Sequence, residues 1–472
     1  MILWRTSCLK PFTTARVSRL TTIASAILIM DIRTIGRETF LPCTSDLINF
    51  RAMKYSVFNP TILRTQSYTN LLITLISLVS LFSSCTFGSV NHPSDTLKPI
   101  QKILINNQVT LGNEQLEKFL PLIQEKRIAI VGNQTSIVKN SHLIDTLLSR
   151  GIQIKKVFAP EHGFRGMADN GEHISNETDK KTGLRIISLF GSNSKPTPEQ
   201  LTDIDIVVYD IQDVGARFYT YISTLHYVME ACAENGKKLI VLDRPNPNGH
   251  YVDGPVLQKE FSSFVGMHPV PIVYGMTVGE YAQMINGESW LKNGILCELT
   301  VIPCQNYTHN TFYSIPVAPS PNLKTDKAIA LYPSLCLFEG TTVSMGRGTE
   351  RPFEMYGHPK FDSTGFTFTP SPRTGSKNPP FSNQKCHGID CSNSMVFPIF
   401  QLDLKPLIQA KKLLNQRDKF INSPSFFNKL AGNSKLKEQI EQNVSEEEIR
   451  NSWKVDLENF KIIRAKYLIY KD

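Results

Sequence analysis

The chain has 472 residues, of which 41% are hydrophobic and 20% are charged, so it is long enough to bury a full core in two domains. Its formal net charge of +9 comes largely from residues 1–84, which hold nine Lys or Arg against three Asp or Glu, while the remainder holds 42 against 39. This near balance excludes the strongly basic surface typical of nucleic-acid-binding proteins, and we expect no nucleic-acid partner.

Residues 1–84 have the pattern of an export leader. Lys54 and Arg64 precede the apolar run 71–82, which is followed by two serines and Cys85. A basic start, an apolar core of about a dozen residues and small residues at the cleavage point describe a secretory signal. The run is shorter than the roughly 20 residues that span a bilayer. Residues 1–52 have no usable periodicity, and Met53 is a second candidate start.

Cysteine at the cleavage point resembles a bacterial lipoprotein signal. We therefore expect lipidation of Cys85, a membrane partner through that lipid, and a periplasmic or outer-membrane-anchored protein. An ordinary signal peptide with an incidental cysteine is the alternative. Residues 85–104 are polar and read as a tether.

The body from residue 105 onward has the pattern of an α/β protein. Apolar runs predict strands at 128–131, 154–158, 184–189, 204–208 and 239–242, and the intervening segments predict helices at 113–124, 143–149, 197–201 and 221–234. The strands lack polar alternation, which is typical of a parallel sheet covered on both faces. Residues 105–268 therefore predict a Rossmann-like domain with a parallel sheet.

Polar side chains follow four of these strands. Asn133 follows the first strand, Glu161 and His162 follow the second, and the segments 209–217 and 243–247 follow the fourth and fifth. The carboxyl ends of parallel strands lie at one edge of a sheet, so these loops predict the floor of a ligand cleft. The first loop has no G-x-G-x-x-G, which argues against a dinucleotide site.

Residues 269–472 differ in character and predict a second, auxiliary α/β domain. A helix is expected at 278–286, and a segment rich in Pro, Gly and aromatic residues follows, with Arg347 between two glycines. Residues 361–394 read as a long loop, and Lys/Glu-rich helices are expected at 404–417 and 436–450.

Glu161 lies in the most informative loop, and a second carboxylate, Glu172, comes eleven residues later. Glycoside hydrolysis requires two carboxyl groups, one that protonates the leaving oxygen and one that acts at the anomeric centre. Loop carboxylates are more often solvated or bound to backbone amides, so this pattern alone is only moderately specific.

Six ordered segments resemble the bacterial exo-acting β-N-acetylmuramidases over roughly residues 105–472. They are 160–166 (PEHGFRG), 210–221 (DIQDVGARFYTY), 243–247 (DRPNP), 319–322 (PSPN), 339–341 (EGT) and 346–354 (GRGTERPFE). The resemblance implies a Rossmann-like catalytic domain, an auxiliary domain and an active-site cleft between them. It also implies release of terminal N-acetylmuramic acid from the non-reducing end of peptidoglycan fragments, with Glu161 and Glu172 as the catalytic carboxylates. We expect the protein to need no cofactor.

N-Acetylmuramic acid carries a lactyl carboxylate, which a guanidinium binds well. Arg217 is the favoured reader of this group, ahead of Arg244 and Arg347, and Tyr219 and Tyr221 are expected to stack on the sugar or bind its hydroxyls. The full predicted substrate-binding set is Asn133, His162, Arg165, Asp210, Gln212, Asp213, Arg217, Tyr219, Tyr221, Arg244, Asn246, Arg347 and Glu350.

Two other functions remain open at this point. One is a metal-dependent peptidoglycan hydrolase or deacetylase with His162, Asp210 and Asp213 as ligands, although these loops hold a single histidine and we expect no metal site. The other is a non-catalytic surface lipoprotein that binds glycans, in which the carboxylates only hold hydroxyl groups.

Overall fold

The computed structural model describes residues 108–164, 177–392 and 398–472. The chain divides into two compact units, Met1–Ser94 and Asp95–Asp472, and all described residues belong to the second. Three predicted site residues, Cys85, Arg165 and Glu172, lie outside the described residues.

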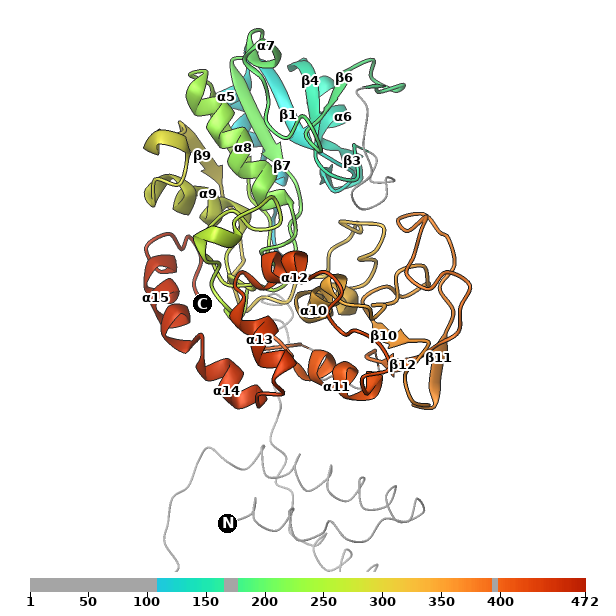
Figure 1. The fold of residues 1–472 in the computed structure, drawn as a ribbon. Coiled ribbons are helices and arrows are strands. Elements are labelled where there is room, and N and C mark those ends of the chain that lie inside the picture. The colour runs from blue at the N-terminus through green and yellow to red at the C-terminus, as the bar shows by residue number, and fades with distance from the viewer. Residues whose placement is uncertain (1–107, 165–176, 393–397) are drawn as a thin grey trace, which may run out of the picture. The chain divides into compact units, whose positions relative to one another are not determined.

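A seven-stranded sheet forms the core of the first half of the body (Figure 1). Its order is β5-β6-β4-β1-β7-β8-β9, and every pairing is parallel except that of the edge strand β5 with β6. The strands are β1 (Arg127–Gly132), β4 (Gln153–Ala159), β5 (Glu177–Thr178), β6 (Arg185–Ser188), β7 (Ile206–Asp210), β8 (Lys238–Leu242) and β9 (Leu299–Ile302). The strand order reverses between β1 and β7, as in doubly wound Rossmann-like sheets.

Both faces of the sheet are covered by helices, which explains the unbroken apolar strands. Ile128 and Ile130 of β1 pack in one cluster with α5 (Leu116–Ile123) and α6 (Leu143–Leu148), whereas Ala129 and Val131 pack in another with α8 (Tyr221–Glu234) and α9 (Val278–Gly287). Short elements complete this half: η1 (Gly112–Glu114), β2 (Ile137–Val138), β3 (Ser141–His142), α7 (Pro198–Leu201), η2 (Lys259–Phe261) and η3 (Lys292–Gly294).

The second half contains a small antiparallel sheet of order β10-β12-β11, which lies at one side of this half with α10 and α11 next to it (Figure 1). The strands are β10 (Met355–His358), β11 (Phe366–Phe368) and β12 (Cys386–Asp390). The helices are α10 (Asp326–Leu335), η4 (Cys336–Gly340), α11 (Lys405–Leu414), α12 (Pro424–Ala431), α13 (Lys435–Glu441), α14 (Glu446–Asn451) and α15 (Lys454–Arg464). The protein is therefore α/β, with a large, mostly parallel sheet and a smaller carboxyl-terminal part with its own sheet.

The two halves are joined by a shared core and by the end of the chain. The larger cluster runs from β1 through α8 and α10 to Phe460 of α15. After α15, the Tyr470 hydroxyl donates to Asp243 Oδ2 at 2.6 Å, beyond the end of β8.

The start of the described chain crosses the carboxyl ends of three strands. The backbones of Thr110 and Gln305 exchange two hydrogen bonds beyond β9, and the Gly112 amide donates to the Asp243 carbonyl beyond β8 at 2.9 Å. Asn113 Nδ2 donates to Asp210 Oδ2 at the end of β7, at 3.0 Å. This segment, residues 108–115, is therefore hydrogen-bonded across the carboxyl ends of β7, β8 and β9.

The predicted strands and helices of the first half are confirmed within a few residues, and the structure differs from the predicted extents in three places. The sheet continues past the predicted boundary at residue 268, because β9 pairs with β8. The predicted loop 361–394 contains β11 and β12. The predicted helix 436–450 is interrupted between α13 and α14.

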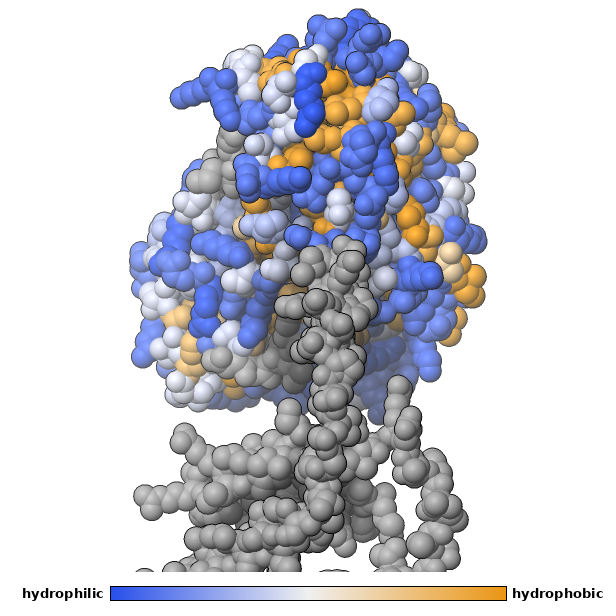
Figure 2. Space-filling model, turned by 180° about the vertical axis from the view of Figure 1, so that it is seen from behind, coloured by the Kyte–Doolittle hydropathy of each residue, from blue (hydrophilic) through white to orange (hydrophobic). Residues whose placement is uncertain are grey.

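The surface seen in Figure 2 is mixed, with hydrophilic residues over most of it and hydrophobic ones gathered toward the part that carries the large sheet. Within the described ranges, no helix is both long and apolar enough to cross a bilayer. The six cysteines of these ranges are free, buried thiols.

Candidate active site

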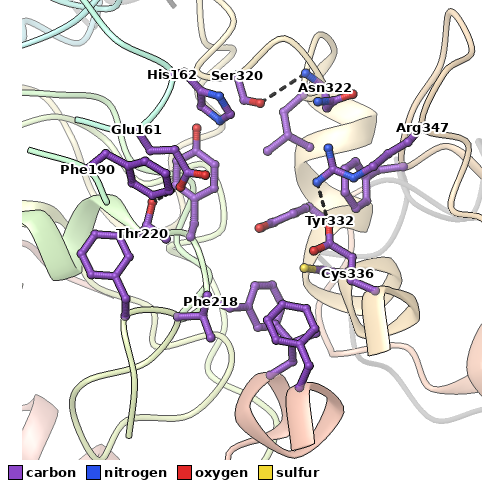
Figure 3. A pocket seen from close by; sticks show the side chains of 18 residues that line it. Glu161, His162, Phe190, Phe218, Thr220, Ser320, Asn322, Tyr332, Cys336 and Arg347 are labelled. Carbon is purple, nitrogen blue, oxygen red and sulfur yellow. Dashed lines mark hydrogen bonds and ion pairs between the residues drawn. The ribbon is translucent and has the colours of Figure 1, made fainter. Parts of the chain in front are cut away.

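A cavity of ≈ 210 Å³ lies where loops of the large-sheet half meet segments of the second half (Figure 3). Its polar lining consists of Glu161, His162, Thr220, Ser320, Asn322, Glu339 and Arg347. Its aromatic lining consists of Phe190, Phe218, Tyr219, Phe264, Tyr332, Phe353 and Phe426. Aromatic walls with a few convergent polar groups are typical of a small-molecule site.

Glu161 enters this cavity from a tight turn after β4. The Gly163 amide donates to the Pro160 carbonyl at 3.0 Å, and His162 has a φ of 70°. A positive φ is uncommon for a residue with a side chain and is often found where function requires a defined geometry. The turn thereby presents both Glu161 and His162 to the cavity.

The Glu161 carboxylate is held by Thr220, the residue directly before α8. Thr220 Oγ1 donates to Glu161 Oε2 at 2.7 Å, and only 6% of Glu161 is exposed (Figure 3). A buried carboxyl group with a fixed hydrogen bond at a cavity wall is suited to proton transfer with a bound ligand.

Arg347 lies on the opposite wall, in the second half of the body (Figure 3). Its Nη2 donates to Glu339 Oε1 of η4 at 2.6 Å, and its guanidinium carbon lies 5.0 Å from the centre of the Phe353 ring. Gly346 and Gly348 on either side have φ of 80° and 82°, and a Cβ at Gly348 would lie 2.6 Å from Pro379. Only glycine fits there without strain, which explains the two glycines around Arg347.

A third wall is formed by residues 318–323, which hydroxyl and amide groups of the first half hold in place. The Tyr219 and Tyr221 hydroxyls donate to the Pro319 carbonyl at 2.9 and 3.0 Å, and Gln134 Nε2 donates to the same carbonyl at 3.1 Å. Tyr219 and Ser320 both line the cavity. The two hydroxyls hold this wall, and the sugar-binding role predicted for the tyrosines stays a prediction.

The structure does not bring Arg217, the favoured carboxylate reader, to the cavity. Arg217 is fully buried, its Nη1 donates to the carbonyls of Pro255 and Val270, and its Nη2 donates to that of Leu430, each at 2.8 Å. Burial lowers the pKa of Arg217 to about 9, so it remains charged at neutral pH. It joins three chain segments and is absent from the cavity lining.

Most other predicted loop residues brace the strand ends against one another and do not line the cavity. Arg244 Nε donates to Asp210 Oδ1 at 2.7 Å, with both side chains buried. Asn133 Nδ2 donates to the Tyr221 hydroxyl, Gln212 Nε2 to the carbonyls of Asp213 and Pro245, and Asn246 Nδ2 to that of Met276. Asp213 accepts from the Tyr274 hydroxyl and from the Gly215 amide.

Glu350 is the one member of the predicted set that the structure places on the surface in the second half. It pairs with Arg373, and 74% of its side chain is exposed. The cavity does not include Glu350 among its lining residues, so the structure gives it no part in this site.

The three ligands of the alternative metal site are not brought together. His162 lines the cavity, whereas Asp210 is paired with Arg244 and Asp213 with Tyr274. Among the described residues, no group of three or more His, Cys, Asp or Glu is arranged to hold a metal ion.

Several residues of the cavity were missed by the predicted set, among them Thr220, Glu339, Phe353 and Tyr332. Glu339 and Phe353 belong to motifs that carry the resemblance, which was the available signal. Burial raises the pKa of Tyr332 well above its usual value, so its hydroxyl remains protonated. Burial also raises the pKa of Cys336, which keeps this thiol neutral and poorly nucleophilic.

Comparisons with known proteins agree with this geometry. A family model described as "Exo-beta-N-acetylmuramidase NamZ, N-terminal" matches residues 128–327, and its C-terminal counterpart matches residues 330–470. A Bacillus subtilis protein, peptidoglycan beta-N-acetylmuramidase NamZ, is 39% identical over 411 residues, which cover 81% of this chain and 97% of the relative.

Two solved structures of DUF1343-family proteins from Bacteroides fragilis have the same fold. One has a TM-score of 0.72 and 48% identity, covering 77% of this chain and 99% of its own. The other has a TM-score of 0.66 and 27% identity, covering 78% and 100%. Together with the two family models, which span both halves of the body, these matches show that the chain belongs to the exo-β-N-acetylmuramidase family.

Proposed function

We propose that the protein is an exo-acting β-N-acetylmuramidase, a glycoside hydrolase that releases terminal N-acetylmuramic acid from the non-reducing end of peptidoglycan fragments. The observation that carries this proposal is the buried Glu161 carboxyl group, fixed by Thr220 at the wall of an aromatic-lined cavity. Membership of the exo-β-N-acetylmuramidase family supplies the reaction class, and the named Bacillus relative supplies the substrate class.

The size of the cavity supports exo action. Its volume of ≈ 210 Å³ is below the range of about 300–1,000 Å³ typical of pockets for drug-sized ligands. A single terminal sugar ring fits such a space better than a run of several linked sugars. The aromatic side chains around it provide faces on which a sugar ring packs.

Glu161 is the proposed general acid. It donates its proton to the glycosidic oxygen as the bond to the anomeric carbon breaks, and the second carboxyl group acts at that carbon, either directly or through a water molecule. Glu172 is the predicted second group. Carboxyl groups about 5–5.5 Å apart give retention of configuration and those about 6.5–9.5 Å apart give inversion.

The test is hydrolysis of an aryl β-glycoside of N-acetylmuramic acid with a poor leaving group. Glu161→Gln keeps the size of the side chain but cannot donate a proton, and we expect turnover to fall by at least about a hundredfold. Glu117→Gln, at an exposed position of α5, is the matched control and should keep parental activity. A Glu161→Gln variant within threefold of the parent would rule out this role.

Export and lipid attachment through Cys85 are also part of the proposal. They are supported by the apolar run 71–82, the basic residues before it and the serines directly before Cys85. A diacylglycerol thioether provides two acyl chains, which suffice for stable anchoring. Cys85→Ser should release an active body from the membrane fraction. Mass spectrometry that finds an unmodified mature start at another residue would refute the anchor.

A further inference from the structure

We propose that Arg347, oriented by Glu339 and Phe353, is the residue that binds the carboxylate substituent of the terminal sugar, and that it sets the preference for an acidic over a neutral amino sugar. This inference rests on the proposed function and names the specificity determinant of the same site. It replaces the role that the sequence pattern gave to Arg217.

The burial of the three candidate arginines separates them. The guanidinium of Arg217 is fully buried and engaged by three carbonyls, and Arg244 is buried against Asp210. Arg347 lines the cavity. It is therefore the candidate whose guanidinium a ligand in the cavity can reach.

The hydrogen bonding of Arg347 leaves room for a ligand. A guanidinium has five N–H donors in a planar fork, and the bond to Glu339 uses one of them. Its side chain is 14% exposed and that of Glu339 is 16% exposed, so both face the cavity without being freely solvated. A carboxylate that enters there can accept two parallel bonds from the remaining donors, which is the geometry that favours arginine over lysine.

The backbone around Arg347 is built to hold the guanidinium in one place. Phe353 lies beneath it with a φ of 61°, a conformation that costs energy for an aromatic residue. The Phe353 ring is itself fixed by Tyr332, with ring centres 5.0 Å apart. The Phe353 backbone conformation and ring packing therefore hold the Arg347 guanidinium at a fixed position in the cavity wall.

The charge of Arg347 is secure and balanced before a ligand arrives. Burial on its own lowers the pKa of Arg347, but attraction to Glu339 outweighs this and raises that pKa above its ordinary value. The ion pair with Glu339 means that Arg347 is not an isolated buried cation, which would lower the stability of the fold. Glu339 therefore positions Arg347, and Arg347 remains able to attract a second carboxylate.

Arg347 and Glu161 lie on different walls of one cavity (Figure 3). The group that reads the substituent is thus separate from the group that acts on the glycosidic bond. This separation means that the loss of Arg347 should reduce discrimination between substrates more than it reduces hydrolysis of a neutral one.

The test compares three aryl β-glycosides: that of N-acetylmuramic acid, that of its lactyl methylamide, and that of N-acetylglucosamine. The parent should prefer the acid to the amide by roughly 10- to 150-fold in kcat/KM, the value of hydrogen bonds to a charged group. Arg347→Met should hydrolyse the acid and the amide at similar efficiency, and Arg347→Lys should retain part of the preference.

Arg351→Met is the matched control. Arg351 lies in the same loop but pairs with Asp390 at 2.9 Å, and the cavity lining does not include it, so this variant should keep the parental preference. Circular dichroism checks that each variant is folded. If Arg347→Met does not fold, the inference is tested by Arg347→Lys and by the acid-to-amide comparison on the parent.

Two results would overturn the inference: a parent that does not distinguish acid from amide, or a folded Arg347→Met that keeps the preference. A parent that hydrolyses none of the three glycosides counts against the proposed function instead.

Discussion

Two tyrosines that donate to the Pro319 carbonyl allow a test of how the cavity wall is held, because their hydroxyls have different further hydrogen-bond partners. The Tyr219 hydroxyl donates to the Pro319 carbonyl at 2.9 Å. The Tyr221 hydroxyl donates to Pro319 at 3.0 Å and also accepts from Asn133 Nδ2 at 3.0 Å. Replacement by phenylalanine removes only the hydroxyl in each case.

The expected losses of stability differ between the two variants. Tyr219→Phe removes one hydrogen bond, worth about 0.5–1.5 kcal/mol, and the Pro319 carbonyl keeps Tyr221 and Gln134 as donors. Tyr221→Phe removes a similar bond and also leaves the amide of Asn133, which is fully buried, without its acceptor. An unsatisfied buried donor costs about 1–3 kcal/mol, so Tyr221→Phe should lose about 2–4 kcal/mol.

Urea unfolding of the two variants measures this difference, with Tyr227→Phe of the same helix as a control outside the cluster. Both substitutions should also raise KM for the muramic acid glycoside, because residues 318–323 carry Ser320 and Asn322 into the cavity. Equal losses of stability, or a larger loss for Tyr219→Phe, would refute this account of the wall.

Two further predictions concern buried charges outside the cavity. Arg217→Lys should lower the free energy of unfolding by at least about 3 kcal/mol, because an ammonium cannot donate to the carbonyls of Pro255, Val270 and Leu430 together. A folded Arg217→Lys variant should nevertheless keep the preference for the acidic sugar. A changed preference at unchanged stability would contradict this prediction. Burial raises the pKa of Asp213 to about 6, above its ordinary value, so the stability from its protonation is fully present below about pH 4 and is lost as pH rises through about 6. The stability of the parent relative to Asp213→Asn, measured by urea unfolding, should therefore fall between pH 4 and pH 7, and a constant difference would show that Asp213 does not titrate in this range.

The large sheet could be predicted from the sequence because its strands are buried on both faces. Five of its strands read as short apolar runs, and α8 ends where Asn235 and Gly236 follow it. The missed strands depend on distant partners. β9 pairs with β8 across some sixty residues of chain, and β12 contains Gly388 and pairs with β10 and β11 within a segment rich in Ser, Pro and Gly.

The loops that form the site could be predicted from the sequence, but which of their side chains face the cavity could not. Glu161 was recognisable because a polar turn directly follows a buried strand. Arg217 and Arg347 each follow a glycine within two residues, and their local sequences do not separate them. What separates them is three carbonyls that lie 38, 53 and 213 residues from Arg217 along the chain. No local pattern encodes contacts of that range.

The segment 108–115 has a mechanical consequence. If the body is held to a membrane through Cys85, any pull on that attachment enters the fold where Thr110 and Gln305 exchange hydrogen bonds of 3.0 and 2.8 Å, and passes to the amide of Gly112 on Asp243. The Tyr470 hydroxyl also donates to Asp243, so a residue near the carboxyl end of the chain stabilises the same contact. A force applied at the amino-terminal side would therefore act on the ends of β8 and β9, whereas the loop that holds Glu161 follows a different strand, β4. The attachment point and Glu161 would then lie at the ends of different strands along the same edge of the sheet.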